Sequence, residues 1–345
     1  MKNNVKLRNP YWDNIKFLLI IFVVIGHFLD YLTGSNRLAQ AIYVFLYSFH
    51  MPMFLFVSGL FLKYDDKHRL RIDRVVYYIL IGYAMKFGLF LVDLIAGGDP
   101  EWSWLTTSNA PWYMFVTAGY LILVYLIRKA NPKIILPITI LISLAAGYFD
   151  FIGDFLCLSK FLVFFPFFYA GYCLTSQKAE KFLDNKALKG AGITVIIAFA
   201  VFCFAFTDYA YMLRPVFASR YSYAAMEFPH IGILLRIIQY FIAMFSIVAI
   251  CAVVPKKNIR FISSSGSRTL PIYFIHYFVA RLFSAVDLQT FLVDKFSFAG
   301  IFMLLVIAIA VSCVLAIPVF NLPFKFIQNI ITFAINKLTN KLKKC

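Results

Sequence analysis

Charged residues are scarce in this chain. They make up 14% of its 345 residues, whereas soluble globular chains carry about 25%. Hydrophobic residues make up 62%, and apolar runs close to the roughly 20 residues that a helix needs to cross a bilayer recur along the chain. These features exclude an ordinary soluble domain and predict an all-α integral membrane protein with many spans.

Cysteines are also few. The six cysteines are scattered, mostly within apolar runs and without paired spacing, which argues against a disulfide framework or a zinc site. We therefore expect no metal. The first apolar run is too long for a cleavable signal and no small-residue cleavage site follows it, so we expect an uncleaved anchor. Because no appended soluble domain is evident, any chemistry must take place among the helices.

Ten apolar segments are predicted membrane spans. They cover about residues 15–33, 41–62, 74–96, 112–127, 134–149, 158–175, 190–206, 231–254, 269–289 and 298–319. With the N-terminus in the cytoplasm, most of the 33 lysines and arginines fall in cytoplasmic loops, as the positive-inside rule requires. The even number of spans then places the C-terminus in the cytoplasm too. The prediction is a multi-pass protein of the cell inner (plasma) membrane.

The net charge of +17 reflects this topology. Its natural partner is the anionic headgroup of membrane lipids, and nucleic acid is not expected as a partner. Residues 1–320 form the predicted ten-helix domain. Residues 321–345 alternate apolar and basic residues at helical spacing, which predicts an amphipathic cytoplasmic tail that lies on the membrane surface.

The first span carries ionisable residues that a simple anchor does not need. Lys16 and His27 are eleven residues apart, so they share one face of a helix and lie about 16 Å apart along its axis. Asp30 falls close to the same face. Intramembrane ionisable residues are costly and usually face a functional interior. The alternative is a lysine that reaches back to the membrane surface and a histidine hydrogen-bonded within the bundle.

Two further spans carry polar residues. His50 belongs to the second span, at the predicted depth of His27, and Pro52 after it should free a backbone carbonyl and kink the helix. On the ninth span, Tyr273 and His276 share one face, and Arg281 lies on an adjoining face. The polar residues of these spans indicate an internal cavity, with a hydrogen-bonded seam between helices as the alternative.

Five motifs, taken in order, resemble those of the membrane acyltransferase-3 family, and most closely its fucose 4-O-acetylase-like branch. The motifs are WDNIKFLLIIFVVIGH, SFHMPMFLFVSGLF, PWYMF, FLVFFPFFYAGY and SSSGSRTLPIYFIHYF, and the resemblance covers about residues 12–320. It implies ten core helices, a cytoplasmic acetyl-CoA donor and O-acylation of glycans, lipid-linked sugars or other small acceptors. The family signature has an arginine where this chain has Lys16, which keeps the charge but loses the two-pronged guanidinium.

The resemblance and the chemistry together assign catalytic roles. Acyl transfer from a thioester to a hydroxyl needs a base, and histidine titrates near neutral pH. We assign His27 as general base or acyl relay, with Asp30 orienting its imidazole. Candidate donors to the oxygen that gains charge in the transition state are His50, Tyr273 and His276.

Binding roles follow from charge and predicted side. Lys16, Arg268, Arg69 and Arg71 are candidates to bind the phosphates of CoA at the cytoplasmic end, although the positive-inside rule alone also explains the arginines. Charged and aromatic residues gather on the outer side: Lys160, Arg214, Arg220, Arg236, Trp102, Trp104 and Trp112. We assign Lys160, Arg236, Arg281 and Trp112 to binding of a glycan or lipid-linked sugar, with an ordinary interfacial aromatic belt as the alternative.

The predicted function is therefore a membrane O-acetyltransferase that acts on a hydroxyl of a cell-surface or lipid-linked glycan. Three alternatives remain open on the residues alone: an O-succinyltransferase of an exopolysaccharide, a transporter of polysaccharide or small molecules, and a partner subunit with a degenerate site. The presence of His27 and His50 argues against degeneracy.

Overall fold

Helices form all the regular elements of the computed structural model, which describes residues 8–62, 69–107 and 109–342. The long helices are α1 (Pro10–Asp30), α2 (Arg37–Tyr47), α3 (His50–Phe61), α4 (Ile72–Ile95), α5 (Trp112–Ile127), α6 (Pro132–Ala146), α7 (Leu158–Cys173), α9 (Lys186–Ala205), α12 (Gly232–Val253), α14 (Thr269–Ala285), α16 (Phe298–Leu315) and α17 (Leu322–Leu342). Shorter helices are α8 (Ser176–Leu183), α10 (Thr207–Met212), α11 (Arg214–Ala218), α13 (Arg260–Ser265), α15 (Leu288–Phe296) and the 3₁₀ turn η1 (Pro318–Asn321). The predicted all-α class is confirmed.

Each of the ten predicted spans coincides with a helix or a pair of helices. Within the described residues, α1, α2 with α3, α4, α9, α12 and α16 are long and apolar enough to cross a membrane. The pairs α7–α8 and α14–α15 qualify when each is taken together, and they bend by 103° and 63°. Helices α5 and α6 are shorter apolar helices. How many of these segments cross the bilayer, and on which side the termini lie, stay predictions.

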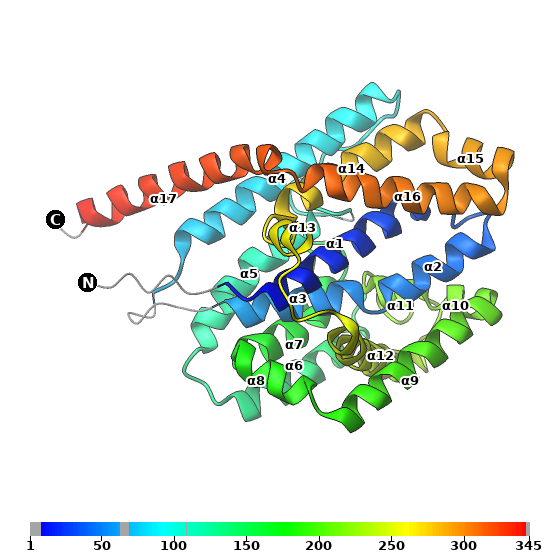
Figure 1. Cartoon of the computed structure of the whole chain (residues 1–345). Helices are drawn as coiled ribbons and strands as arrows, with labels where there is room; N and C mark the ends of the chain where they lie inside the picture. The colour runs from blue at the N-terminus through cyan, green and yellow to red at the C-terminus, as the bar shows by residue number, and fades with distance from the viewer. Residues whose placement is uncertain (1–7, 63–68, 108, 343–345) are drawn as a thin grey trace.

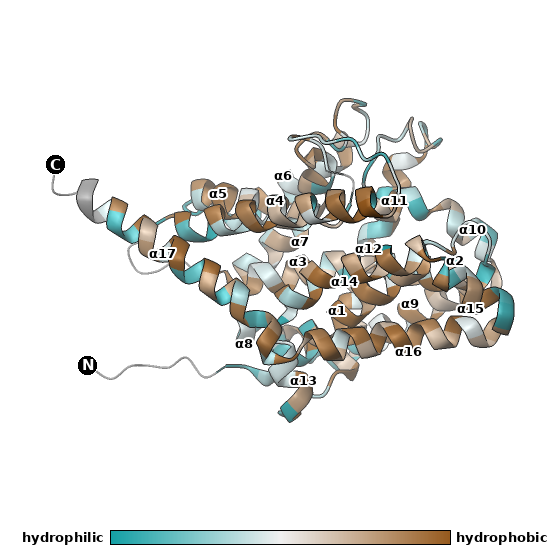
Figure 2. Ribbon diagram, turned by 90° about the horizontal axis from the view of Figure 1, so that it is seen from above, coloured by the Kyte–Doolittle hydropathy of each residue, from teal (hydrophilic) through white to brown (hydrophobic). Residues whose placement is uncertain are grey.

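Helix α1 runs through the middle of the bundle (Figure 1). In its most apolar stretch, 72% of the residues are buried. The share of buried residues in the corresponding stretch is 17% for α9 and 33% for both α4 and α16. Hydrophobic residues colour the middle of the long helices, and hydrophilic residues gather toward their ends, as at α10 and at the turn between α15 and α16 (Figure 2). The polar residues of α1 are therefore enclosed by protein, and the outer helices present apolar side chains to lipid.

The beginning of α1 is fixed to segments far away in the chain. Trp12 donates its indole N–H to Glu180 at 2.8 Å. The side-chain amide of Asn14 donates to the backbone carbonyl of Pro255 at 2.8 Å and accepts from Ser263 at 2.6 Å. At Gly266 the backbones touch, because a Cβ there would lie 1.7 Å from the carbonyl oxygen of Asp13. These contacts hold α8, α13 and the start of α14 against the central helix.

The second span is broken at Ser48–Phe49, where α2 ends and α3 begins. Pro52 lacks the N–H that would bond to the carbonyl of Ser48, four residues earlier, and its ring crowds that carbonyl. The helix is therefore interrupted at the carbonyl that Pro52 leaves free, and His50 lies in the first turn of α3.

Helices α3 and α7 cross at two glycines. A Cβ at Gly59 would lie 1.9 Å from the carbonyl oxygen of Phe168, and a Cβ at Gly171 would lie 2.0 Å from that of Phe56. Small residues at such crossings let helix backbones approach closely within a membrane. The crossing fixes α7, which carries Lys160, against α3, which carries His50.

Helix α17 packs along α4 and projects beyond the rest of the bundle (Figure 1). Phe324 and Ile331 are buried, whereas Phe326 and Phe333 are exposed. Exposed apolar side chains on a basic helix fit a helix that lies on a membrane surface, and that placement stays a prediction. Residues 343–345, and part of the basic segments 2–8 and 63–74 counted for topology, lie outside the described residues.

We predict that Gly171→Ala destabilises the protein by about 1–3 kcal/mol or more, because the added methyl overlaps the α3 backbone. The control is Gly190→Ala on α9, where nothing lies within 4 Å of the added Cβ. Thermal unfolding in detergent should show a lower Tm for the first variant and an unchanged or higher Tm for the second, since alanine favours helix. Equal Tm values for Gly171→Ala and the wild type would contradict the crossing.

Candidate active site

One cavity contains His27 and His50, and we call it the histidine pocket. Its volume is about 350 Å³, and it lies toward the end of α1, where Asp30 and the segment 214–221 also line it. The sequence prediction placed His27 and His50 at matching depth on neighbouring spans, and the structure brings both side chains to this cavity. Tyr47 lies between them, with its ring centroid 6.3 Å from His27 and 4.7 Å from His50.

A third histidine stands beside His27. The ring centroid of His276 on α14 lies 5.2 Å from that of His27, and that of Tyr277 lies 4.7 Å away. Both His27 and His276 keep one ring nitrogen buried without a hydrogen-bond partner among the described residues: Nδ1 of His27 and Nε2 of His276. Unpartnered buried polar atoms are costly, so the two adjacent rings are candidates for a functional role in proton transfer or ligand binding.

Backbone carbonyls decide which nitrogen of two histidines carries the proton. Nδ1 of His50 lies 2.6 Å from the carbonyl oxygen of Leu46, and Nδ1 of His276 lies 2.9 Å from that of Ile272. A carbonyl only accepts, so Nδ1 is the protonated nitrogen in both neutral rings and Nε2 is a bare acceptor. Tyr273 likewise donates its hydroxyl to the carbonyl of Ala110. In this structure, the three residues predicted to donate to the charged oxygen of the transition state already donate their protons to backbone carbonyls.

Asp30 does not hold His27 in this structure. Its carboxylate accepts from Arg214 at 2.7 Å, and no hydrogen bond joins it to His27 in the described part of the chain. The prediction that Asp30 orients the imidazole therefore lacks the contact that it needs. Asp30 instead fixes Arg214, whose guanidinium also lies 5.0 Å from the ring centroid of Tyr43, at the edge of the histidine pocket.

Cations and aromatic rings line the rest of the histidine pocket. The ammonium of Lys160 is 5.2 Å from the ring centroid of Trp112, and both residues face the cavity as predicted acceptor-binding residues. Arg220 also lines it and pairs with Asp154. The cavity is therefore a polar, cationic chamber with an aromatic wall.

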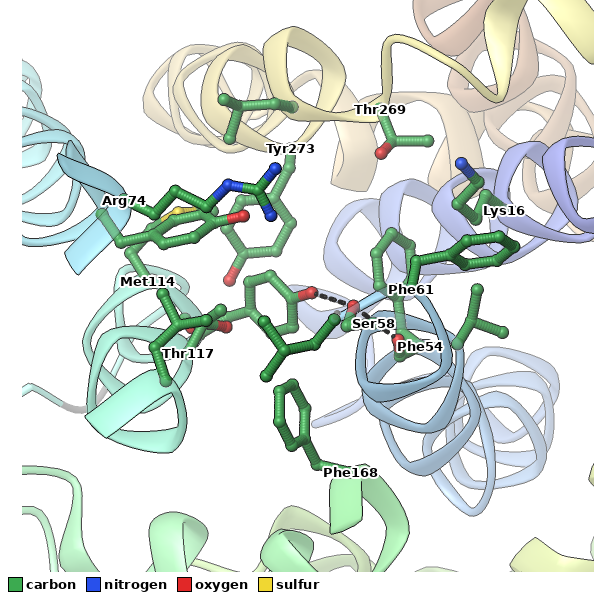
Figure 3. A pocket seen from close by; sticks show the side chains of 16 residues that line it. Lys16, Phe54, Ser58, Phe61, Arg74, Met114, Thr117, Phe168, Thr269 and Tyr273 are labelled. Carbon is green, nitrogen blue, oxygen red and sulfur yellow. Dashed lines mark hydrogen bonds between the residues drawn. The ribbon is translucent and has the colours of Figure 1, made fainter. Parts of the chain in front are cut away.

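A second cavity lies toward the beginning of α1, and we call it the lysine pocket. It measures about 240 Å³ and is lined by Lys16, Arg74 and the first residues of α14 (Figure 3). Ser58 and Tyr113 join their hydroxyls at 2.7 Å across it. Tyr273 lines both pockets, so the cavity with basic residues and the cavity with histidines adjoin at this residue.

The predicted phosphate-binding residues separate into two groups. Lys16 lines the lysine pocket, and its ammonium pairs with Asp13 at 2.6 Å. Arg268 donates to the carbonyl of Ala316 at 2.9 Å, and Arg71 pairs with Asp73 at 2.9 Å. Neither Arg268 nor Arg71 lines the pocket, and Arg69 does not line it either.

Two predicted acceptor-binding residues lie outside the histidine pocket. Arg281 pairs with Asp93 and donates to the hydroxyl of Tyr31 at 3.3 Å. Arg236 is fully buried on α12, 5.3 Å from the ring centroid of Tyr223, and its three guanidinium nitrogens have no hydrogen-bond partner in the residues that the structure describes. The structure gives neither residue a contact with the chamber.

The bundle thus has a basic cavity at one end of its central helix and a histidine cavity at the other. Residues 9–317 match the family model described as an acyltransferase domain, Acyl_transf_3. The chain belongs to the acyltransferase-3 family. No curated protein and no solved structure matches the chain. The family resemblance predicted from the five motifs is confirmed, and the narrower fucose 4-O-acetylase-like branch stays a prediction.

The acyltransferase is an O-acyltransferase, an enzyme that transfers groups other than amino-acyl groups, on a multi-pass membrane chain. The match contains both pockets and ends at residue 317, before α17 begins. In the described residues, no group of three His, Cys, Asp or Glu side chains is placed to hold a metal ion. The expectation that the acyltransferase needs no metal stays a prediction.

The structure adds residues to the site that the sequence did not assign to it. Arg74 and Ser58 line the lysine pocket, and Arg214 and Arg220 line the histidine pocket. The sequence did show the charges, but each arginine had a simpler explanation: the positive-inside rule for Arg74, and an ordinary outer interface for Arg214 and Arg220. A signal for their role in the acyltransferase appears only when the helices are placed around α1.

Proposed function

We propose that the acyltransferase moves an acetyl group from cytoplasmic acetyl-CoA to a hydroxyl of a cell-surface or lipid-linked glycan in the plasma membrane. One observation carries the proposal: two cavities lie toward opposite ends of α1 and meet at Tyr273. A basic cavity suits a polyanionic donor, and a histidine cavity suits proton removal from a hydroxyl. The arrangement lets donor and acceptor approach from opposite sides of the membrane.

The lysine pocket is the proposed donor entrance. Lys16 offers an ammonium as a point charge to a phosphate, in competition with the carboxylate of Asp13. Arg74 reaches into the same pocket from α4 (Figure 3). Its guanidinium can supply the two-pronged phosphate contact that lysine lacks at the position of the family's arginine. A pair of cations on separate helices thus replaces a single arginine.

The spacing along α1 sets how far the donor must reach. Lys16 and His27 are about 16 Å apart by helix rise. An extended pantetheine arm is of that order, comparable to five extended residues at ~3.3 Å each. The charged nucleotide then stays near the cytoplasmic surface, where its burial in lipid is avoided, and only the arm and the acetyl group enter. Tyr273 must turn aside for the thioester to reach His27.

His27 is the proposed general base. It takes the proton of the acceptor hydroxyl while the hydroxyl oxygen attacks the thioester carbonyl. When the tetrahedral intermediate collapses, the carbon–sulfur bond breaks, an ester forms, and the proton on His27 goes to the leaving thiolate of CoA. The histidine ends neutral, and no oxidant or further reactant is needed.

His276 is the proposed orienting residue, in place of Asp30. Its Nδ1–H is held by the carbonyl of Ile272, so its bare Nε2 can accept the Nδ1–H of His27. The ring centroids are 5.2 Å apart, and a turn of the His27 ring toward His276 would pair the two nitrogens and leave Nε2 of His27 as the base. His50 is held in the same tautomer by the carbonyl of Leu46. Its Nε2 can therefore accept a hydrogen bond from the hydroxyl of the glycan.

Lys160 is the proposed stabiliser of the charge that develops on the thioester oxygen. It is buried, lines the histidine pocket and carries a positive charge that would favour negative charge on the thioester oxygen. Such a donor in a water-poor site is worth roughly 3–4 kcal/mol of transition-state stabilisation. Trp112 beside it provides an aromatic face of the kind that packs against a sugar ring.

The first prediction for the reaction concerns His27. Purified protein in lipid nanodiscs, supplied with radiolabelled acetyl-CoA and a cell-surface glycan extract, should transfer label to glycan and release CoA. His27→Ala should lower both rates at least 100-fold, the scale of general-base catalysis. The control is His230→Ala, which removes an exposed histidine outside the histidine pocket. Wild-type turnover in His27→Ala would refute the assignment. Glycan movement into sealed vesicles that contain the protein, without CoA release, would favour a transporter.

The second prediction concerns Lys16. Lys16→Ala should raise the KM for acetyl-CoA about tenfold, and Lys16→Arg should retain most activity because the family pattern has arginine there. The protein should still fold, since Asp13 keeps Arg8 as a partner. Lys133→Ala is the control, because it removes an exposed charge on the same predicted side without touching the lysine pocket. An unchanged KM in Lys16→Ala would mean that Lys16 does not bind the donor.

The third prediction concerns sidedness. In sealed vesicles of known orientation, acetyl-CoA should support transfer only when it is supplied on the side that bears the N-terminus. Because CoA is charged and does not cross the bilayer, the other side should give less than a tenth of that rate. Reaction with acetyl-CoA on the opposite side alone would overturn the two-entrance mechanism. Succinyl-CoA at the same concentration tests the alternative donor.

A further inference from the structure

A third cavity opens beside the histidine pocket, and we call it the tryptophan pocket. It measures about 240 Å³ and lies between the end of α4 and the segment 100–111, where Trp102 lines it. Lys86 ties this segment down by donating to the carbonyl oxygens of Ser103 and of Thr106, the latter at 2.6 Å. These hydrogen bonds hold the segment that forms one wall of the pocket.

The tryptophan pocket adjoins the chamber where the chemistry is proposed. Asn109 and Arg220 line both cavities. Arg220 pairs with Asp154, which faces the tryptophan pocket. A ligand that fills the histidine pocket can therefore continue past Asn109 and Arg220 without leaving the protein surface.

The two cavities differ in charge. Lys160, Arg214 and Arg220 line the histidine pocket with one carboxylate, that of Asp30. The tryptophan pocket is lined by three carboxylates, Asp93, Glu101 and Asp154, and by two cations, Lys86 and Arg220. Asp93 and Asp154 are paired with Arg281 and Arg220. Carboxylate oxygens accept hydrogen bonds from hydroxyls and repel phosphates. The lining therefore changes from an excess of cations in the histidine pocket to a slight excess of carboxylates in the tryptophan pocket, which favours hydroxyl groups over anions there.

Trp102 adds an aromatic wall with an unused donor. Its ring packs edge-on against Phe90 and lies 5.4 Å from the ammonium of Lys86. Its indole N–H is buried without a hydrogen-bond partner in the described chain. A sugar offers a hydroxyl oxygen for the unpartnered N–H and an apolar face for the part of the ring that lines the pocket. An acyl chain offers only the apolar contact, and it would have to cover the carboxylates.

We propose that the tryptophan pocket is a second acceptor subsite, which binds the neighbouring, neutral sugar of a glycan whose reacting sugar occupies the histidine pocket. This inference rests on the proposed function and adds to it. The preferred acceptor is then an oligosaccharide or polysaccharide of at least two sugars, and the sugar next to the reacting one carries free hydroxyls and no phosphate or carboxylate.

Binding to an array of synthetic glycans of one to four sugars, neutral and acidic, tests the inference. Wild-type protein in nanodiscs should bind at least one glycan of two or more sugars ten times more tightly than the matching monosaccharide. Trp102→Ala should reduce that preference at least fivefold, and Trp102→Phe should retain most of it because the aromatic face remains. Glu101→Gln, a change at an exposed side chain of the pocket, should weaken the preference without altering packing.

The outcomes separate the subsite from the proposed reaction. Equal binding of monosaccharides and longer glycans by the wild type, or no binding at all, overturns the subsite. An undiminished length preference in both Trp102→Ala and Glu101→Gln overturns it too. Release of CoA from acetyl-CoA by the same wild-type preparation reports on the reaction alone. A length preference without CoA release would therefore retain the subsite and refute the acetyl transfer.

Discussion

The cost of placing ionisable side chains in a membrane is the constraint on which this structure depends. Lys16 and His27 lie on a helix whose surroundings, if lipid, would leave both side chains unsolvated. The bundle removes that cost by placing α1 at its centre and apolar helices such as α9 and α16 outside. Each cavity then forms where one of these polar side chains meets a neighbouring helix, so the position of the chemistry follows from the burial of α1.

Close backbone contacts turn this enclosure into a defined geometry. Gly59 and Gly171 let α3 and α7 meet at their backbones, and Gly266 sets the start of α14 against α1. The helices that carry His50, Lys160 and Tyr273 are thereby fixed around the central helix. Glycine contacts suit this task in a membrane, where lipid competes for apolar surface and close packing supplies much of the association energy between helices.

Main-chain carbonyls determine what the polar side chains can do. The carbonyls of Leu46 and Ile272 hold Nδ1 of His50 and His276 and leave Nε2 of each ring as an acceptor. The hydroxyl of Tyr273 is similarly occupied by Ala110. The same residues looked alike in the sequence as candidate donors of hydrogen bonds. The backbone makes two of them acceptors, and the cations of the histidine pocket are Lys160, Arg214 and Arg220.

The membrane class, the ten apolar segments, the freed carbonyl before Pro52 and the family could all be predicted from the sequence, because hydropathy, proline chemistry and ordered motifs act locally along the chain. The placement of Lys16 and His27 on one face could be predicted too, since helical periodicity fixes that relation. Which residues join them depends on the packing of the helices. Asp30 binds Arg214 rather than His27, and Arg74 enters the lysine pocket from a helix far along the chain. Partner choice depends on how helices are rotated and packed, and no local pattern encodes that rotation.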